Sequence, residues 1–296
     1  MLTDTLIAGG IAIVVASPAV ALQVAVISDL NGSYGSTDYG SQVADAVSAI
    51  LELHPDLVLV TGDMVAGQRR PVLATSEVKA MWDAFHAIVT EPLTSAGIAV
   101  AVTPGNHDAS AYDAFRAERN VYAKEWRDRR PDVSFSSDEE YPFSYAFDVD
   151  GVRFVSLDVT TVGPLSADQV VKLESVFEGA GETRIVFSHL PLWEFAQGRE
   201  TEIIGDPELA SVFETLGIDL HLSGHHHAFY PGASEGIAYV GQACLGASPR
   251  RLMGASDRAP RGFTLLDIDV DTGDIVIDFR ASPDFTNRYD HASASS

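Results

Sequence analysis

The sequence predicts an α/β fold. Apolar runs of strand length, rich in β-branched residues, alternate along the chain with segments whose apolar residues recur at helical spacing. Of the 296 residues, 46% are hydrophobic, which is enough to bury a sizeable core. A layered α/β fold of this length can form without splitting into separate domains.

The N-terminal half alternates predicted strands and helices. Residues 22–28 form an apolar run rich in β-branched side chains, as expected of a buried strand. Apolar residues at helical spacing predict helices over 42–53 and 77–89. Further buried strands are predicted at 57–61 and 98–102, so that each helix connects two strands.

The segment 109–138 is predicted to be helical, and it differs in charge from the rest of the chain. Two interpretations are open. The segment could be a solvated helix face that balances acidic surroundings, or a helical cap inserted over 108–140 that attracts an anionic substrate. Its basic residues are Arg116, Arg119, Lys124, Arg127, Arg129 and Arg130.

The C-terminal half begins with a predicted hairpin over 145–160, in which Asp150 and Gly151 supply the turn. Apolar spacing predicts helices over 166–177 and 207–216. The last residues, 290–296, form a polar tail. Further strands are predicted at 184–188, 218–223, 239–245, 263–270 and 275–279.

Residues 1–21 predict a signal peptide. Residues 6–20 are apolar, and Ala19-Val20-Ala21 matches the small-x-small pattern of a signal-peptidase site. Asp4 and the lack of Lys or Arg before residue 6 argue against export, and the alternative is a buried first strand or helix. Cleavage would leave a domain over 22–289 that is periplasmic or secreted, with no stable membrane insertion. An uncleaved chain would be cytoplasmic.

The amino-acid composition disfavours some classes of binding partner and excludes some structural features. The net charge is −23 at pH 7, so nucleic acid and anionic membrane surfaces are poor partners on electrostatic grounds. Cys244 is the only cysteine, which excludes an intrachain disulfide and a cysteine metal cluster. The oligomeric state stays open.

Five predicted strands end in carboxylate, amide or imidazole side chains. Ligand sites of open α/β sheets lie outside the carboxyl ends of the strands, so these side chains are expected to converge. Any one of these side chains alone is typical of a turn, a helix cap or a surface histidine. Their occurrence at the ends of five strands requires one common cause. Their number and mixture suit two metal ions better than one tetrahedral zinc, with Asp63 best placed as the shared ligand. The residues are Asp29, Asp63, Asn106 with His107 and Asp108, His189, and His225 with His227.

These motifs resemble those of the calcineurin-like metallophosphoesterases. The resemblance implies a four-layer α/β/β/α sandwich of two mixed β-sheets flanked by helices, and hydrolysis of phosphoesters with two metal ions. It further implies that one ion is held by Asp29, Asp63 and His227, and the other by Asp63, Asn106, His189 and His225. The matching blocks are Asp29-x-Asn31, Gly62-Asp63, Gly105-Asn106-His107-Asp108, His189 and Gly224-His225-x-His227.

The resemblance also implies a mechanism. A hydroxide that bridges the two ions would attack the phosphorus of a small phosphomonoester or phosphodiester. His107 would stay off the metals and protonate the leaving group, and Asp108 would orient His107.

One position departs from the pattern of the family, since Asn31 stands where the first block usually has a histidine. An amide oxygen is a weaker ligand than imidazole for borderline metals, so this metal position is expected to be weak or to favour manganese or iron over zinc. The alternative function is a degenerate, non-catalytic metal-binding protein on the same fold, while the acidic charge disfavours a nuclease. Retention of His107 with Asp108 favours the enzyme.

The remaining histidines are expected to lie off the metals. His226 falls between two proposed ligands and is expected to point elsewhere. Tyr34 and Arg69 lie near proposed ligands in the sequence and are candidate substrate contacts. The histidines interpreted as structural or surface residues are His54, His86, His221 and His291.

Overall fold

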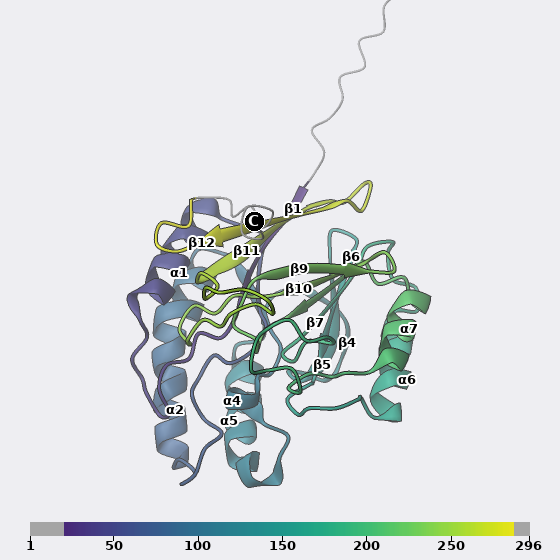
Figure 1. The fold of residues 1–296 in the computed structure, drawn as a ribbon. Coiled ribbons are helices and arrows are strands. Elements are labelled where there is room, and N and C mark those ends of the chain that lie inside the picture. The colour runs from purple at the N-terminus through teal and green to yellow at the C-terminus, as the bar shows by residue number, and fades with distance from the viewer. Residues whose placement is uncertain (1–20, 287–296) are drawn as a thin grey trace, which may run out of the picture.

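The computed structural model describes residues 21–286, in which two β-sheets pack against each other between layers of helices (Figure 1). This confirms the predicted four-layer α/β/β/α sandwich. The predicted polar tail, and the predicted signal peptide up to residue 20, lie outside the described residues. Within residues 21–286, no helix is both long enough and apolar enough to cross a membrane.

The first sheet has five strands in the order β12-β11-β1-β2-β3. The strands β1, β2 and β3 are parallel, whereas β11 pairs with β1 in antiparallel orientation and β12 pairs with β11 in antiparallel orientation. From Val24 onward the residues of β1, and all residues of β2, are buried on both faces of the sheet, as their continuous apolar runs predict. The bounds are β1 Ala21–Ile27, β2 Leu57–Val60, β3 Ala99–Val102, β11 Gly262–Asp269 and β12 Ile275–Ala281.

The second sheet has seven strands in the order β4-β5-β6-β7-β8-β10-β9. Its centre, from β6 to β10, is parallel, and antiparallel strands close both edges. The predicted hairpin is confirmed, because β5 and β6 pair across Asp150 and Gly151, whose positive φ angles form the turn. The bounds are β4 Ser134–Glu140, β5 Ser144–Val149, β6 Val152–Leu157, β7 Arg184–Ser188, β8 Leu220–Ser223, β9 Tyr230–Ser234 and β10 Ile237–Gly241.

Helices lie on the outer sides of the two sheets, with α1 and α2 at one side of the molecule and α6 and α7 at the other (Figure 1). Local sequence fixes where α6 begins, since Ser166 and Gln169 form a reciprocal capping box. The helices are α1 Ser41–Leu53, α2 Thr75–Phe85, a π-helical turn His86–Thr90, α3 Glu91–Ser95, α4 Asn106–Ala109, a 3₁₀ turn Asp113–Phe115, α5 Arg116–Asp128, α6 Ala167–Val176 and α7 Pro207–Thr215.

A hydrogen bond between side chain and backbone joins the two sheets just before the site. Val26 of β1 and Phe147 and Phe187 of the second sheet belong to one buried apolar cluster. Within it, the hydroxyl of Tyr145 on β5 donates to the carbonyl of Val102 at 2.6 Å and accepts from its N–H at 2.9 Å. Because Val102 ends β3, this contact fixes the strand exit that leads into the Gly-Asn-His-Asp motif.

The segment expected to be helical over 109–138 contains a helix and a strand, so that expectation is wrong at its C-terminal end. Helix α5 ends at Asp128, and residues 134–140 form β4, the edge strand of the second sheet. This strand is polar along most of its length and joins the sheet because Phe135 packs against Tyr145 and Phe147. Polar edge strands of this kind also deter pairing with other chains.

Five of the six basic residues of this segment are paired with carboxylates, and the sixth, Arg127, donates to the carbonyl of Tyr141. Arg129 forms an ion pair with Glu125 at 2.7 Å, and Arg119 pairs with Asp158. Arg116, Lys124 and Arg130 pair in the same way with Asp113, Asp128 and Asp138. These pairs favour the interpretation of the segment as a charge-balanced surface.

Candidate metal centre

The predicted ligands lie at the carboxyl ends of strands from both sheets, where the two sheets meet. Asp29 follows β1 and Asp63 follows β2, while Asn106 begins α4 after β3. His189 follows β7 directly. The motif with His225 follows β8, so five strand exits come together as predicted.

Four of these residues have backbone conformations that non-glycine residues seldom adopt. Asp29, Asp63, His225 and His227 have φ angles of 52°, 56°, 64° and 53°. They account for four of the nine non-glycine residues with positive φ in the described chain. Left-handed conformations persist only where the surroundings enforce them, and they concentrate at functional sites.

Glycine at two positions allows these loops to approach each other. A Cβ added to Gly105 would lie 2.0 Å from the backbone nitrogen of Asp63. A Cβ added to Gly224 would lie 2.2 Å from Ser28 Oγ and 3.0 Å from Asp29 Oδ2. Each motif therefore needs its glycine so that its donor atoms can reach the carboxylate of a neighbouring strand.

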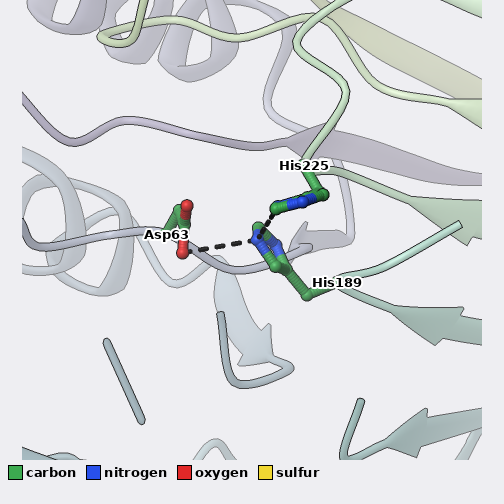
Figure 2. A group of neighbouring side chains, drawn as sticks. All are labelled: Asp63, His189 and His225. Atoms are coloured by element: carbon green, nitrogen blue, oxygen red, sulfur yellow. Dashed lines mark hydrogen bonds and ion pairs between the residues drawn. The ribbon is translucent and has the colours of Figure 1, made fainter. Parts of the chain in front are cut away.

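One donor set consists of Asp63, Asn106, His189 and His225. Atoms of Asp63, His189 and His225 lie within 4.8 Å of one another (Figure 2). The Nε2 atom of His189 lies 3.4 Å from Asp63 Oδ1, 3.2 Å from His225 Nδ1 and 2.9 Å from Asn106 Oδ1. All four predicted ligands of this ion converge.

Hydrogen bonds behind the histidines turn their lone pairs toward this point. His189 Nδ1 lies 2.8 Å from the carbonyl of Thr61, and His225 Nε2 lies 2.9 Å from the Glu202 carboxylate. Both partners only accept hydrogen bonds, so we assign the proton of each neutral ring to that nitrogen. The opposite nitrogens then face each other, together with two oxygens, without a hydrogen between them. This arrangement fits a bound metal ion.

The second donor set consists of Asp29, Asp63 and His227, whose atoms also lie within 4.8 Å of one another. His227 Nε2 lies 3.1 Å from Asp29 Oδ1. Its Nδ1 lies 3.0 Å from the carbonyl of Ser248, which leaves Nε2 free to bind a metal. Since Asp63 belongs to both sets, it is placed to bridge two ions as predicted.

The electrostatics of the site favour positive charge. Burial opposes ionisation of Asp63, but His189 and His107 nearby hold the pKa of this carboxyl below its usual range. For His189, burial alone would lower the pKa, whereas the Asp63 and Asp29 carboxylates raise the pKa to about 9. Both shifts show a buried point that stabilises a cation, whether a proton or a metal.

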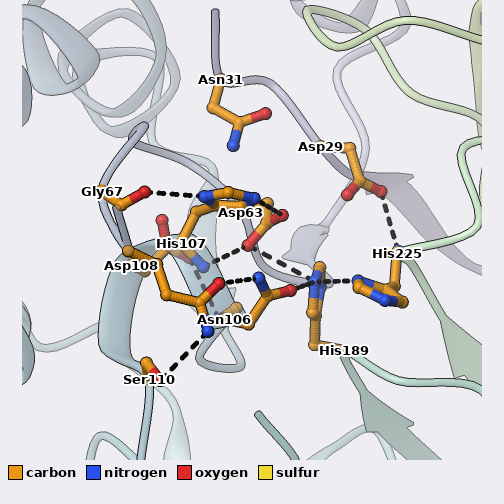
Figure 3. Close-up of polar contacts among 12 residues, drawn as sticks. Asp29, Asn31, Asp63, Gly67, Asn106, His107, Asp108, Ser110, His189 and His225 are labelled. Carbon is orange, nitrogen blue, oxygen red and sulfur yellow. Dashed lines mark hydrogen bonds and ion pairs between the residues drawn. The ribbon is translucent and has the colours of Figure 1, made fainter. Parts of the chain in front are cut away.

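His107 lies beside the two donor sets with its ring 30% exposed, and its Nε2 is 4.0 Å from Asp63 Oδ2. The expectation that Asp108 orients His107 is wrong. His107 Nδ1 lies 2.8 Å from the carbonyl of Gly67 (Figure 3). The Asp108 carboxylate instead accepts the backbone N–H groups of Val65 and Gly105. Burial of Asp108 raises its pKa to about 8. Asp108 therefore holds the backbone of two metal-binding loops together.

Asn31 is buried beside the second donor set and lines the same cleft as His107 and His227. Its side-chain N–H group faces the carbonyl of Val65 at 3.4 Å, a weak contact that leaves the amide oxygen available. Its role as a metal ligand stays a prediction.

Two polar residues that support the donors were missed by sequence reasoning. Gln68 accepts a hydrogen bond from the Asn106 amide, which turns the Asn106 oxygen toward the metal position. Glu202 contacts His225 and also pairs with Arg199. Glu202 and Arg199 lie in the loop between β7 and α7, where no strand ends, so the rule that found the other residues could not find them.

The other histidines lie outside the donor sets. His226 points away, with Nε2 3.2 Å from the carbonyl of Glu202 and its ring 4.5 Å from that of Phe195. His86 is buried against Thr90, and His221 against Ser188. His54 is exposed at the end of α1, and His291 lies outside the described residues.

A cleft of about 330 Å³ opens beside the second donor set and is lined by His227, Asn31 and His107. A larger cavity of about 620 Å³ lies elsewhere, between α6 and the strands β4 to β6, but no histidine lines it, so the chemistry points to the smaller cleft. Residues lining the smaller cleft include Asn31, Tyr34, Arg69, His107, Arg199, His227, Ser248 and Arg250.

Solved structures with the same fold share little sequence with this chain. A dimetal phosphatase from Danio rerio is 16% identical, with a TM-score of 0.60 over 88% of this chain and 96% of that one. GAP50, described as the anchor in the inner membrane complex of Plasmodium, is 14% identical, with a TM-score of 0.61 over 91% and 87% of the two chains. The protein TT1561 of Thermus thermophilus is 12% identical, with a TM-score of 0.51 over 88% and 99%. No curated protein matches the chain by sequence.

The sequence profile of the calcineurin-like phosphoesterases matches residues 22–229, which is more than half of the chain and includes every predicted metal ligand. The profile match agrees with the shared fold and with the two donor sets that meet at Asp63. The chain therefore belongs to the calcineurin-like phosphoesterase family.

Proposed function

We propose that this protein is a metal-dependent hydrolase of small phosphoesters. The metal ligands are proposed to be Asp29, Asn31, Asp63 and His227 for one ion, and Asp63, Asn106, His189 and His225 for the other. When bound, the two ions would lower the pKa of water and offset negative charge on the phosphoryl group.

Residues of the protein supply the proton for the leaving group and hold the proton donor in place. In the net reaction, the oxygen of water bonds to phosphorus while the bond from phosphorus to the leaving oxygen breaks. His107 in its protonated form gives a proton from Nε2 to that leaving oxygen. The carbonyl of Gly67 holds Nδ1–H and so keeps the ring in place. The products are an alcohol and inorganic phosphate, or a phosphomonoester if the substrate is a diester.

The position of His107 is the observation that carries this proposal. A protein that only binds metal does not need a partly exposed imidazole, held by its own hydrogen bond, in the cleft beside the second donor set. The alternative, a metal-binding protein without activity, draws support from Asn31 and from GAP50, a neighbour described as an anchor rather than as an enzyme.

Elemental analysis combined with assays tests the proposal. The purified protein would be loaded with manganese, zinc or iron and assayed with p-nitrophenyl phosphate and bis-p-nitrophenyl phosphate. Near two ions per chain and turnover with either ester support the hydrolase, and the faster ester shows which class it prefers. Metal binding without turnover under any ion would instead establish the binding protein.

A further inference from the structure

The cleft beside the second donor set is lined by cations in a strongly acidic protein. Three arginines, Arg69, Arg199 and Arg250, line it, and no Asp or Glu of the described chain is among the lining residues. The chain as a whole has 42 acidic and 19 basic residues. Such a concentration of positive charge at one opening favours an anionic ligand.

The three arginines are not equivalent. Arg199 forms an ion pair with Glu202, so its charge is largely offset. Arg250 has a buried Nε without a hydrogen-bond partner, and no carboxylate of residues 21–286 forms an ion pair with it. Arg250 lines the cleft together with His227, and its backbone N–H donates to the carbonyl of His227 at 3.2 Å.

Arg69 lines the same cleft as His107, the proposed leaving-group acid. The carbonyl of Gly67, two residues earlier, holds the His107 ring. The hydroxyl of Tyr34 donates to the carbonyls of Arg69 and Pro71, which fixes this loop. Arg69 is exposed, and within the described part of the chain it has no ion-pair partner.

A single phosphoryl group at the metal centre can satisfy Arg250 but leaves Arg69 without a partner. Because Arg69 and His107 line the same cleft, the guanidinium of Arg69 can pair with an anion on the leaving group that His107 protonates. We infer that the substrate is a small phosphomonoester whose leaving group carries a second anionic group, a carboxylate or a phosphate. This inference rests on the proposed function, because it identifies the substrate class of the same site.

Binding of stable phosphonates tests the inference without turnover. Calorimetry on the metal-loaded protein would compare propylphosphonate, which has one anionic group, with 4-phosphonobutyrate and propane-1,3-bisphosphonate. We expect the second anion to tighten binding by about tenfold, the effect of one charge-assisted contact. The tighter of the two dianionic ligands shows whether the second group is a carboxylate or a phosphate.

The neighbouring arginines provide matched controls. For each ligand with two anionic groups, we compare its affinity with that of propylphosphonate. Arg69→Gln should bring this affinity ratio close to one. Arg70→Gln should leave that ratio unchanged, because Arg70 is exposed outside the cleft. Arg250→Gln should weaken all three ligands alike, whereas Arg251→Gln should have no effect.

The inference is overturned if all three phosphonates bind equally well, if none binds, or if Arg69→Gln and Arg70→Gln change the ratio to the same extent. Failure of the proposed function looks different. If the protein hydrolyses no phosphoester but still binds the ligands with two anionic groups more tightly in an Arg69-dependent way, it is a receptor for such ligands. If it hydrolyses phosphoesters but binds all three phosphonates equally well, the proposed hydrolase stands and the proposed substrate class is wrong.

Discussion

The Glu202 carboxylate lies 2.9 Å from Nε2 of His225, on the side of the imidazole ring opposite the metal donors. The hydrogen bonds from His225 and Arg199 outweigh partial burial and lower the pKa of Glu202 to about 2, so it is ionised at neutral pH. Glu202 thus fixes which nitrogen of His225 carries the proton. A carboxylate behind a histidine ligand also raises its basicity toward metal.

Removing this carboxylate should weaken one metal site. We expect Glu202→Ala to reduce metal affinity by about 10–100-fold at the site of His189 and His225, because His225 loses the partner that orients it. Titration against a chelator of known affinity measures the effect. Glu200→Ala is the matched control, since Glu200 is exposed in the same loop and does not touch a histidine ligand. Equal affinities in the two variants would contradict the role of Glu202.

Asp63→Asn should affect both metal sites, because the two donor sets share Asp63. We expect elemental analysis to show the loss of both ions from this variant, whereas Asp29→Asn should lose only the ion of its own set. Circular dichroism checks that both variants fold. An Asp63→Asn protein that keeps one ion at full affinity would show that the carboxylate is not shared.

His107→Ala should lower kcat by about 10²–10⁴-fold without changing metal content, because it removes the leaving-group acid and no predicted ligand. The loss should be larger for an alkyl phosphate than for p-nitrophenyl phosphate, whose leaving group departs readily without a proton. His54→Ala, at the exposed end of α1, is the control. Equal losses for both esters would mean that His107 does not act as an acid.

Asn31→His should restore the ligand that the family usually has. We expect the variant to bind zinc more tightly at the site of Asp29 and His227, and to shift preference away from manganese, because imidazole is a softer ligand than an amide oxygen. Competition titrations with the two metals measure the change. An unaltered preference would place Asn31 outside the coordination sphere.

Two buried histidines outside the donor sets should make the metal-free protein sensitive to acid. Burial lowers the pKa of His86 and His221 to about 3, from an ordinary value of 6.5. Between these values the unfolded chain binds protons that the folded chain excludes, so stability is full above pH 6.5 and falls as the pH drops toward 3. Each histidine contributes about 1.4 kcal/mol per pH unit.

Chemical denaturation at several pH values, with a chelator present, measures this dependence. In His221→Gln, the slope of the unfolding free energy against pH should be smaller by the contribution of one proton, because Gln does not titrate. In His54→Gln, this slope should equal that of the wild type. A slope that His221→Gln does not change would show that His221 takes up a proton in the folded protein.

The sequence predicted the strands that carry ligands better than it predicted the other elements. Parallel strands buried on both faces need continuous apolar runs, and each run here stops where a donor begins, so position and chemistry could be found together. The strands β4 and β9 lack that pattern. The polar residues of β4 and Pro231 with Gly232 in β9 join their sheet through pairing with neighbouring strands, which only the folded chain brings together.

The same limit applies to the site. The metal donors were predictable because strand ends converge, but their supports come from loops whose course depends on tertiary packing. The resemblance to the family implied that Asp108 orients His107. In the fold, Asp108 points inward to the backbone of Val65 and Gly105, and the carbonyl of Gly67 takes its expected place.

The left-handed conformations of Asp29, Asp63, His225 and His227 have an evolutionary consequence. Glycine would adopt these angles with less strain, so the chain gives up folding free energy, on the order of 1 kcal/mol or more at each position, to present a donor atom there. A population selected only for thermal tolerance would lose these four residues early and keep the sandwich. Glycine at any one of the four positions is therefore expected to relieve backbone strain while removing a donor atom from the site.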